Sequence, residues 1–246
     1  MTDYRTYHLS LKEKIKYGWI GLGISSGIAI LFYKSLLAAF ICSPFVLWFW
    51  KYQEKELVKR RKWEFQQQFL QGIRALSAAL NAGYSIENAF AEARKDLRLM
   101  YREDAFVVQE FSWIEQQLSL NRNVEEVLDE MAQRTAIEDV ENFAEIFQTA
   151  KRTGGNLMKV IHQTEKNIGD RLEVQREMET LLSQKKLEAN IMSIVPLGII
   201  VYMWVSSPGF LDVLYHNVFG VVFMSGVLGA YIAAYLLMKR IVNITW

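Results

Sequence analysis

The stretch Lys151-Arg152-Thr153-Gly154-Gly155-Asn156-Leu157 decides how this chain folds. Lys151 and Arg152 suit the last turn of a helix, because cations are stabilised at the negative end of the helix dipole. Gly154 and Gly155 permit the left-handed backbone that closes a helix. Asn156 is a good N-cap for a following helix, because its side-chain oxygen can accept from a free backbone N–H. The stretch therefore predicts two helices joined by a tight reversal.

Two earlier stretches have the same pattern of a Gly or Asn followed by a helix cap. Gly83-Tyr84-Ser85 is the first, with Ser85 as the predicted N-cap, and Asn121-Arg122-Asn123 is the second, with Asn123 as the cap. Apolar residues at helical spacing fill the segments between these turns, without β-alternation. We predict helices over about 63–81, 86–96, 100–120, 123–134 and 138–153, and a sixth that begins after Asn156 and continues towards an apolar block.

Two apolar blocks flank these predicted helices. The first covers residues 17–50 and is too long for one straight crossing of a bilayer core about 30 Å thick, at about 1.5 Å per helical residue. We therefore predict a hairpin that turns at Lys34-Ser35; one long, tilted helix is the alternative. The second block contains residues 191–210 and 218–238, which we predict to form another hairpin.

Basic residues lie just before and just after each apolar block. They occur before residue 17, at 51–62, at Lys185-Lys186 and at Lys239-Arg240, whereas the loop 206–217 contains Asp212 and no Lys or Arg. Because basic flanks mark the cytoplasmic side, both termini are predicted to be cytoplasmic. The expected fold is all-α, with four transmembrane helices as two hairpins flanking a six-helix cytoplasmic bundle. The predicted parts are 1–50, 51–188 and 189–246.

Composition excludes several classes of function. The net charge of +1 gives no bulk electrostatic basis for binding nucleic acid. Cys42 is the single cysteine, so an intrachain disulfide is impossible, and its apolar surroundings predict a membrane-helix side chain. His8, His162 and His216 fall on separate elements, and no HExxH, CxxC or GxxxxGK[ST] motif occurs. We expect no catalytic residue, no metal and no cofactor.

Four features admit a binding function beside a structural one, and we favour the structural one for each. A carboxylate cluster opposed only by Arg134 is either a divalent-cation site or a solvated face. The run 59–62 is either a partner site or a headgroup anchor, and the Gly154-Gly155 turn either cradles phosphate or closes a helix. Asn190 and Pro196 either line a pathway or only shape the third crossing. The clustered carboxylates are Glu125, Glu126, Asp129, Glu130, Glu138, Asp139, Glu141 and Glu145.

The segment Phe69-Leu70-Gln71-Gly72-Ile73-Arg74-Ala75-Leu76-Ser77-Ala78-Ala79-Leu80-Asn81-Ala82-Gly83-Tyr84-Ser85-Ile86 resembles the opening of the type II secretion system F-domain family. The segment 147–157, with its paired glycines, resembles that domain's closing helix turn. One such domain between two membrane hairpins is similar to the tight-adherence (TadB/TadC-type) pilus platform proteins. At the middle turn Asn121 stands where the family commonly has glycine, and asparagine tolerates the left-handed backbone.

This resemblance implies an integral platform protein of a type IV pilus-like assembly machine in the cell membrane. Its implied partners are a cytoplasmic hexameric ATPase, pilin subunits and a second platform protein, in a homo- or hetero-oligomer within the lipid bilayer. A membrane receptor or transporter subunit, or a membrane-bound enzyme, are the competing functions. If the predicted helices run up and down, the three turns share one end, where Tyr84, Arg122, Lys151 and Arg152 are the candidate partner-binding residues; the alternative is that these cations only complement helix ends.

Overall fold

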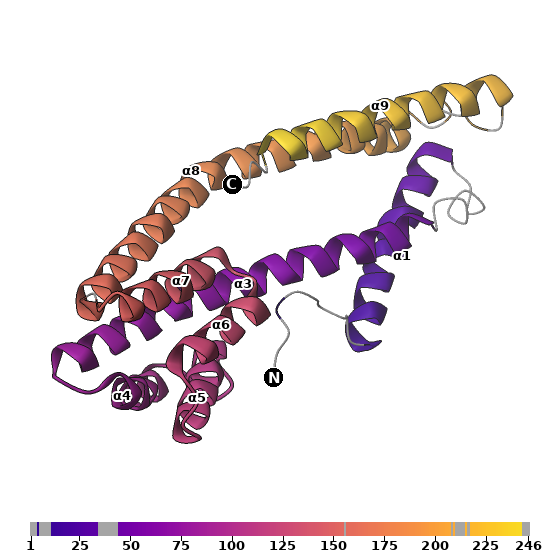
Figure 1. Ribbon diagram of the computed structural model, residues 1–246. Helices are drawn as coiled ribbons and strands as arrows, with labels where there is room; N and C mark the ends of the chain where they lie inside the picture. Colours follow the sequence, from indigo (N-terminus) through magenta and orange to yellow (C-terminus); the bar gives the residue numbers. More distant parts are fainter. Residues whose placement is uncertain are drawn as a thin grey trace. The chain divides into compact units, whose positions relative to one another are not determined.

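The computed structural model describes Tyr4, residues 11–33, 44–154 and 156–207, Gly209, Tyr215 and residues 217–242. Within these residues the regular structure is entirely helical, so the all-α prediction is confirmed (Figure 1). The helices are α1 (Leu11–Tyr33), α3 (Pro44–Asn81), α4 (Ile86–Met100), α5 (Phe106–Ser119), α6 (Val124–Thr135), α7 (Glu138–Arg152), α8 (Leu157–Ser206) and α9 (Val218–Val242).

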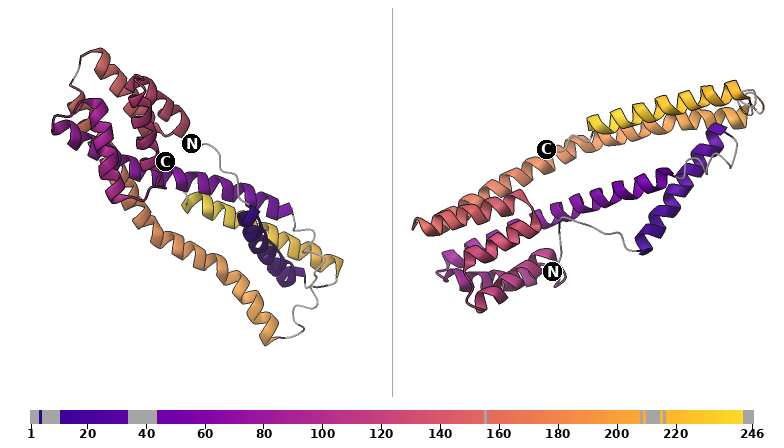
Figure 2. Two further views of the ribbon diagram at one scale, coloured as in Figure 1. Left: turned by 90° about the horizontal axis from the view of Figure 1, so that it is seen from below. Right: turned by 45° about the vertical axis from the view of Figure 1, so that its right-hand side comes forward.

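The chain divides into two compact units. The first contains residues 1–8 and 54–175, and the second contains residues 9–53 and 176–246. Helices α3 and α8 contribute residues to both units, as the two further views in Figure 2 allow the reader to trace. The predicted boundaries at residues 51 and 188 stay predictions.

One apolar core holds the first unit together. It is built from one face of each of its helices, as the apolar spacing predicts. Aromatic rings run through its centre: Phe65 stacks on Phe69 at 5.8 Å, Phe69 meets Phe143 edge-on at 5.8 Å, and Phe143 lies 5.9 Å from Phe147. All four rings are almost completely buried, so α3 and α7 form the middle of the unit.

Polar contacts fix the directions of the central helices. Gln66 donates to Asp139 at 3.0 Å, and Phe69 packs on Phe143, so α3 and α7 run parallel. Arg171 lies 3.1 Å from Asp139, near the start of α7, so α8 runs antiparallel to α7. The end of α3 and the turn between α7 and α8 therefore lie at one end of the unit, as Figure 1 also shows.

Three helix boundaries differ from the prediction, and the first is the end of the predicted helix 86–96, which extends to Met100 as α4. The predicted helix 100–120 begins only at Phe106, because α4 continues to Met100 and Tyr101 then adopts an extended conformation with φ of −129°. Helix α3 begins at Pro44 rather than near residue 63. The segment 51–62 is rich in Lys, Glu and Arg, which are good helix formers, and proline is favoured in the first turn.

The second unit contains the apolar helices. Among the described residues, α1, α8 and α9 each have a segment long and apolar enough to cross a membrane. Tyrosines join them: Tyr33 shares a hydrogen bond of 2.8 Å with Ser225, and Tyr231 donates to the carbonyl of Ser193 at 2.9 Å. Helix α8 contains residues 191–206 of the third predicted crossing, and α9 contains the fourth.

The second predicted crossing falls on residues 35–50, of which the structure describes only 44–50, within α3. The four-crossing layout thus stays a prediction. Several predicted features lie outside the described residues, namely the Lys34-Ser35 turn, Cys42, Gly155, His8, His216 and Asp212.

Candidate partner-binding surface

The first two turns have the same backbone structure. After α3, Gly83 has φ of 91°, its N–H donates to the carbonyl of Leu80, and the N–H of Tyr84 donates to that of Ala79. After α5, Asn121 has φ of 58°, and the N–H groups of residues 121 and 122 donate to the carbonyls of residues 118 and 117. Both are Schellman motifs, which satisfy the last carbonyls of a helix. Asparagine takes the left-handed position in the second, as predicted.

The helices that follow these turns are capped unequally. The hydroxyl of Ser85 accepts from the N–H of Asn88 at 3.4 Å, and the side-chain oxygen of Asn156 accepts from the N–H of Lys159 at 3.1 Å. Asn123 makes no such bond to the backbone; its amide instead donates to Glu126 at 3.3 Å. Two of the three predicted N-caps therefore form, and the third makes a side-chain contact within the capping-box spacing.

All three turns lie at one end of the first unit, which we name the turn end. Gly154, with φ of 66°, closes α7 at the same end as Gly83. Lys151, just before it, pairs with Glu125 at the start of α6 with 2.7 Å between Nζ and Oε2. This ion pair brings the Asn121–Asn123 turn next to the Gly154 turn. The turn end thus gathers the four candidate partner-binding residues on the ends of α3, α5 and α7.

The four candidate side chains differ in how accessible they are to a partner. Arg122 forks onto the carboxylate of Glu130 and also donates to Gln117 at 3.0 Å, so it is only half-exposed. Lys151 is held by Glu125. Arg152 is exposed, and Tyr84 is 47% exposed. Arg122 is therefore less accessible to a partner than Arg152, because α6 supplies a carboxylate that neutralises it within the domain.

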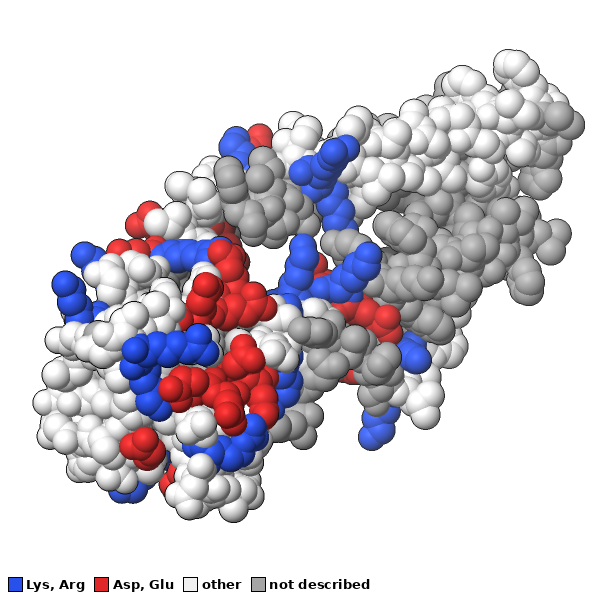
Figure 3. All heavy atoms as spheres, viewed as in Figure 1, with Lys and Arg blue, Asp and Glu red and all other residues white. Residues whose placement is uncertain are grey.

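The predicted acidic face is also more fully paired than the sequence suggested. Glu125, Glu130 and Glu138 bind Lys151, Arg122 and Arg171, so Arg134 is far from the only opposing cation. Figure 3 shows acidic and basic side chains interleaved on the face in view. Among the residues that the structure describes, no group of three or more acidic, His or Cys side chains is placed to hold a metal ion.

The basic run at the start of the domain takes part in packing. The ammonium of Lys62 donates to the carbonyl of Ala136 at 2.6 Å, where Ala136 ends α6 in a left-handed conformation with φ of 47°. The guanidinium of Arg61 lies 5.9 Å from the centre of the Phe106 ring. At least these two cations therefore have a structural role inside the unit.

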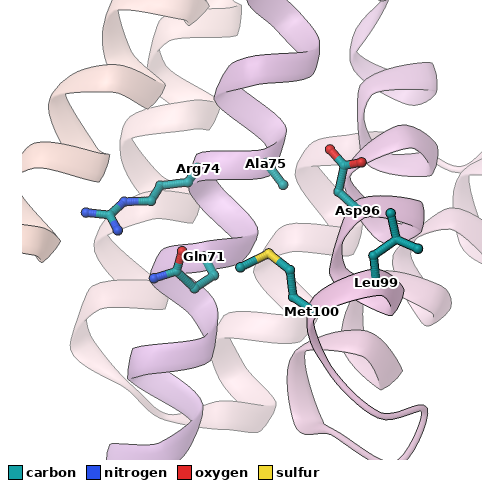
Figure 4. Close-up of a pocket in the computed structure, with 6 residues that line it drawn as sticks. All are labelled: Gln71, Arg74, Ala75, Asp96, Leu99 and Met100. Atoms are coloured by element: carbon teal, nitrogen blue, oxygen red, sulfur yellow. The ribbon is translucent and has the colours of Figure 1, made fainter.

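A shallow groove between α3 and α4 was not foreseen from the sequence. Its volume is ≈ 380 Å³, and Leu99, which borders it, is 88% exposed. Arg74 points from α3 towards α8, where it pairs with Glu165 at 3.5 Å. Because none of the lining side chains pairs a nucleophile with a base, the groove suits contact rather than chemistry. The lining residues are Gln71, Arg74, Ala75, Asp96, Leu99 and Met100 (Figure 4).

Comparison with known families gives the identity of this arrangement. The sequence model described as "Type II secretion system (T2SS), protein F" matches residues 73–205, more than half of the chain. The chain belongs to the type II secretion system protein F family. The resemblance predicted from the sequence is thereby confirmed. No curated protein and no solved structure matches the chain.

The protein F match covers all three turns and ends in the apolar part of α8. Together with the apolar helices, membership of this family indicates a multi-pass protein of the inner membrane. Residues before 73 lie outside the match, among them Tyr4. Tyr4 is fully buried in the core of the first unit, against Phe65 and Phe106. Sequence reasoning missed this contact, because an isolated tyrosine in a polar tail carries no periodic signal.

Proposed function

We propose that this protein is the platform of a type IV pilus-like, tight-adherence machine, where it couples a cytoplasmic hexameric ATPase to pilin extrusion. The observation that supports this most is the course of α8. This helix begins directly after the Gly154 turn and runs without interruption into a candidate membrane span, all within the region that matches protein F. A continuous helix is a stiff connection, so a load applied at the turn end is carried to the membrane segment without passing through a loop.

The position of Tyr4 supports a cytoplasmic N-terminus on the same side as the domain. Tyr4 packs in the core of the unit formed by residues 54–175, while the candidate span α1 lies between them in sequence. If α1 crosses the membrane, the chain must cross again before residue 54 for this contact to form. That favours the predicted hairpin over a single tilted helix, and with it an even number of crossings.

The surface proposed for the ATPase is the turn end, with Tyr84 and Arg152 as its free side chains. An exposed aromatic ring and an exposed cation are typical components of protein interfaces. Arg122 and Lys151 support this surface indirectly, since their ion pairs with Glu130 and Glu125 hold the turns together. The acidic faces of α6 and α7 are the second candidate surface.

The test is a pull-down of the cognate ATPase with full-length protein in detergent. Tyr84→Ala combined with Arg152→Glu is expected to reduce recovery of the ATPase at low salt. The difference from wild type should shrink at high salt, because salt screens the interactions of charges at the rim of an interface. Arg102→Glu is the matched control, because Arg102 is an exposed cation in the connection at the opposite end of α5. Equal recovery of all three proteins would move the contact to the acidic faces.

Charge reversal at all four predicted positions would be a weaker experiment. Arg122→Glu and Lys151→Glu place like charges against Glu130 and Glu125, so a loss of binding would be confounded by disruption of the turns. Restricting the change to Tyr84 and Arg152 avoids this problem. Melting temperature and membrane insertion should match wild type for the variant to be informative.

We also propose that the protein has no catalytic activity of its own. The sequence contains no nucleotide-binding or metal-hydrolase motif, and the groove between α3 and α4 has no catalytic arrangement. Purified protein should therefore hydrolyse ATP no faster than a mock preparation. Hydrolysis that copurifies and disappears on replacement of a single carboxylate would contradict the proposal.

A receptor or transporter function, rather than a platform function, would be favoured if the gene lacked a neighbouring pilin gene and a neighbouring gene for a secretion-type ATPase.

A further inference from the structure

Pro196 lies inside the apolar part of α8, and the helix continues through it to Ser206. Proline has no backbone N–H, so the carbonyl of Met192, four residues earlier, lacks its usual helix donor, and the proline ring crowds that carbonyl. In a bilayer no water replaces the donor, and a proline is tolerated where neighbouring groups satisfy the backbone before it. We name residues 192–195, which precede Pro196, the proline turn.

A side chain of α9 supplies a donor to the proline turn. The hydroxyl of Tyr231 donates to the carbonyl of Ser193 at 2.9 Å. The hydroxyl of Ser193 lies 2.9 Å from the carbonyl of Ala189, on its own helix, and 3.2 Å from the sulfur of Met238, on α9. Tyr231 and Met238 are about two helical turns apart, so they lie on the same face of α9. Ser193 is thus a polar contact point between the two helices.

Apolar contacts of α8 and α9 continue beyond Pro196. Leu197 of α8 and Leu228 of α9 pack against one apolar cluster, which contains the buried Met224 of α9. After Pro196, α8 therefore meets earlier residues of α9 than it meets at Ser193, so the two helices run antiparallel, as the predicted hairpin requires. The tyrosine hydroxyl is held in place by contacts that precede and follow it along α9.

We propose that Tyr231 supplies the hydrogen-bond donor for the proline turn, and that this bond fixes the register in which α8 pairs with α9. A phenol suits the task, because its ring packs in an apolar interface while its hydroxyl finds a polar partner there. Displacing α9 along α8 by one turn, about 5.4 Å, would take the hydroxyl out of reach of Ser193. Pro196 thus shapes the third predicted crossing rather than lining a pathway. The inference holds whether or not the protein is a pilus platform.

Hydrogen exchange of the full-length protein in detergent, read by mass spectrometry in a double-mutant cycle, tests this pairing. Tyr231→Phe keeps the ring and removes the donor, so amides within 190–200 should exchange about threefold faster, the size expected for one hydrogen bond between membrane helices. Pro196→Ala restores the missing N–H of α8, so Tyr231→Phe should have much less effect in that background. Tyr235→Phe is the matched control, because Tyr235 is exposed one turn later on α9, and it should leave 190–200 unchanged.

Two results of the cycle would overturn the proposal. Unchanged exchange over 190–200 in Tyr231→Phe would show that the hydroxyl does not support the proline turn. An equal effect of Tyr231→Phe with and without Pro196 would show that the hydroxyl acts independently of the proline. As a second measurement, a short bifunctional thiol reagent should join Ser193→Cys to Met238→Cys within one chain, on a background without other cysteines. A crosslink found only between two chains, or none at all, would also overturn the proposal.

Discussion

Arg171 on α8 clamps the start of α7, with its Nη1 3.1 Å from Oδ1 of Asp139. Its Nη2 lies 2.8 Å from Oε2 of the neighbouring Glu138, and the other oxygen of Asp139 accepts from Gln66 on α3 at 3.0 Å. Asp139 is buried, and it lies in the first turn of α7, where the helix dipole favours a negative charge. Three helices of the domain therefore meet at one carboxylate.

This clamp predicts acid sensitivity. The hydrogen bond from Arg171 holds the pKa of Glu138 below its ordinary value of 4.5, and the pKa of Glu130 is lowered in the same way by Arg122. A carboxyl group with a lowered pKa stabilises the folded state above its ordinary pKa, and that stabilisation is lost as pH falls through the lowered value. We therefore expect the melting temperature to decrease once the pH drops below about 4.5.

Arg171→Met should lower the melting temperature at pH 7 and flatten its decline towards acid. Lys159→Met, which removes an exposed cation from the same helix, is the control and should leave the pH profile as it is in wild type. The measurement is thermal melting of detergent-solubilised protein between pH 3.5 and pH 7. An identical profile for Arg171→Met and wild type would contradict this account of the clamp.

Gly72 in the middle of α3 is predicted to reject even a methyl group. A Cβ there would lie 2.6 Å from the ring of Phe111 and 3.1 Å from a methyl of Val107, both buried on α5. Gly→Ala inside a helix usually gains up to about 1 kcal/mol, whereas overpacking a core costs about 1–3 kcal/mol. Since Phe111 is enclosed, we expect the packing cost to win and Gly72→Ala to lower the melting temperature.

Gly169→Ala is the matched control for Gly72→Ala. A Cβ at Gly169 would meet nothing closer than the end of the Arg74 side chain at 3.9 Å. This variant should be neutral or slightly stabilising, because only the helix-propensity gain remains. If both variants melted at the same temperature, close contact between α3 and α5 at Gly72 would be refuted.

Substitution of Gly154 tests the effect of backbone conformation separately from that of side-chain packing. Its φ is 66°, and a Cβ added there would have nothing within 4 Å. Gly154→Val should therefore destabilise the protein by more than about 1 kcal/mol through backbone strain alone. Gly154→Asn should cost much less, because asparagine tolerates this conformation, as Asn121 does in the second turn. Equal melting temperatures for wild type and Gly154→Val would argue against strain at this turn.

The membrane topology can be tested by labelling. On a Cys42→Ala background, Ser207→Cys should react with an impermeant thiol reagent added to intact cells, and Ser119→Cys should not. Both serines are exposed, so a lack of reaction reflects location rather than burial. The reverse pattern would place the domain outside the cell and contradict the positive-inside prediction.

Local signals in the sequence predicted most of the domain. Gly83, Ser85, Asn121 and Gly154 each act on their own backbone, so the turns could be placed without knowledge of the packing. The ion pairs of Arg122 and Arg171 join residues that only helix packing brings together. The pattern of each helix by itself therefore predicted a solvated face of carboxylates, whereas in the structure Glu130 and Glu138 form ion pairs with these arginines.

Tyr4 marks the limit of the same reasoning. It lies 106 residues from Glu110, to which its hydroxyl donates, in a tail with no helical periodicity. The extent of α3 was also underestimated, because the polar segment 51–62 was interpreted as a boundary. That segment consists of helix-forming residues without a breaker, so the helix simply continues.

Because α8 is one unbroken helix, the segment that follows Asn156 also fixes the rotation of the apolar segment about the helix axis. Each residue of an α-helix turns the chain by about 100° and advances it by about 1.5 Å. One residue inserted near residue 180 would therefore rotate the apolar segment by about 100° about the helix axis with respect to the segment that follows Asn156. Four inserted residues would leave a net rotation of only about 40°. Evolution can thus lengthen this helix easily only in steps close to whole turns, whereas the loops of the domain carry no such restriction.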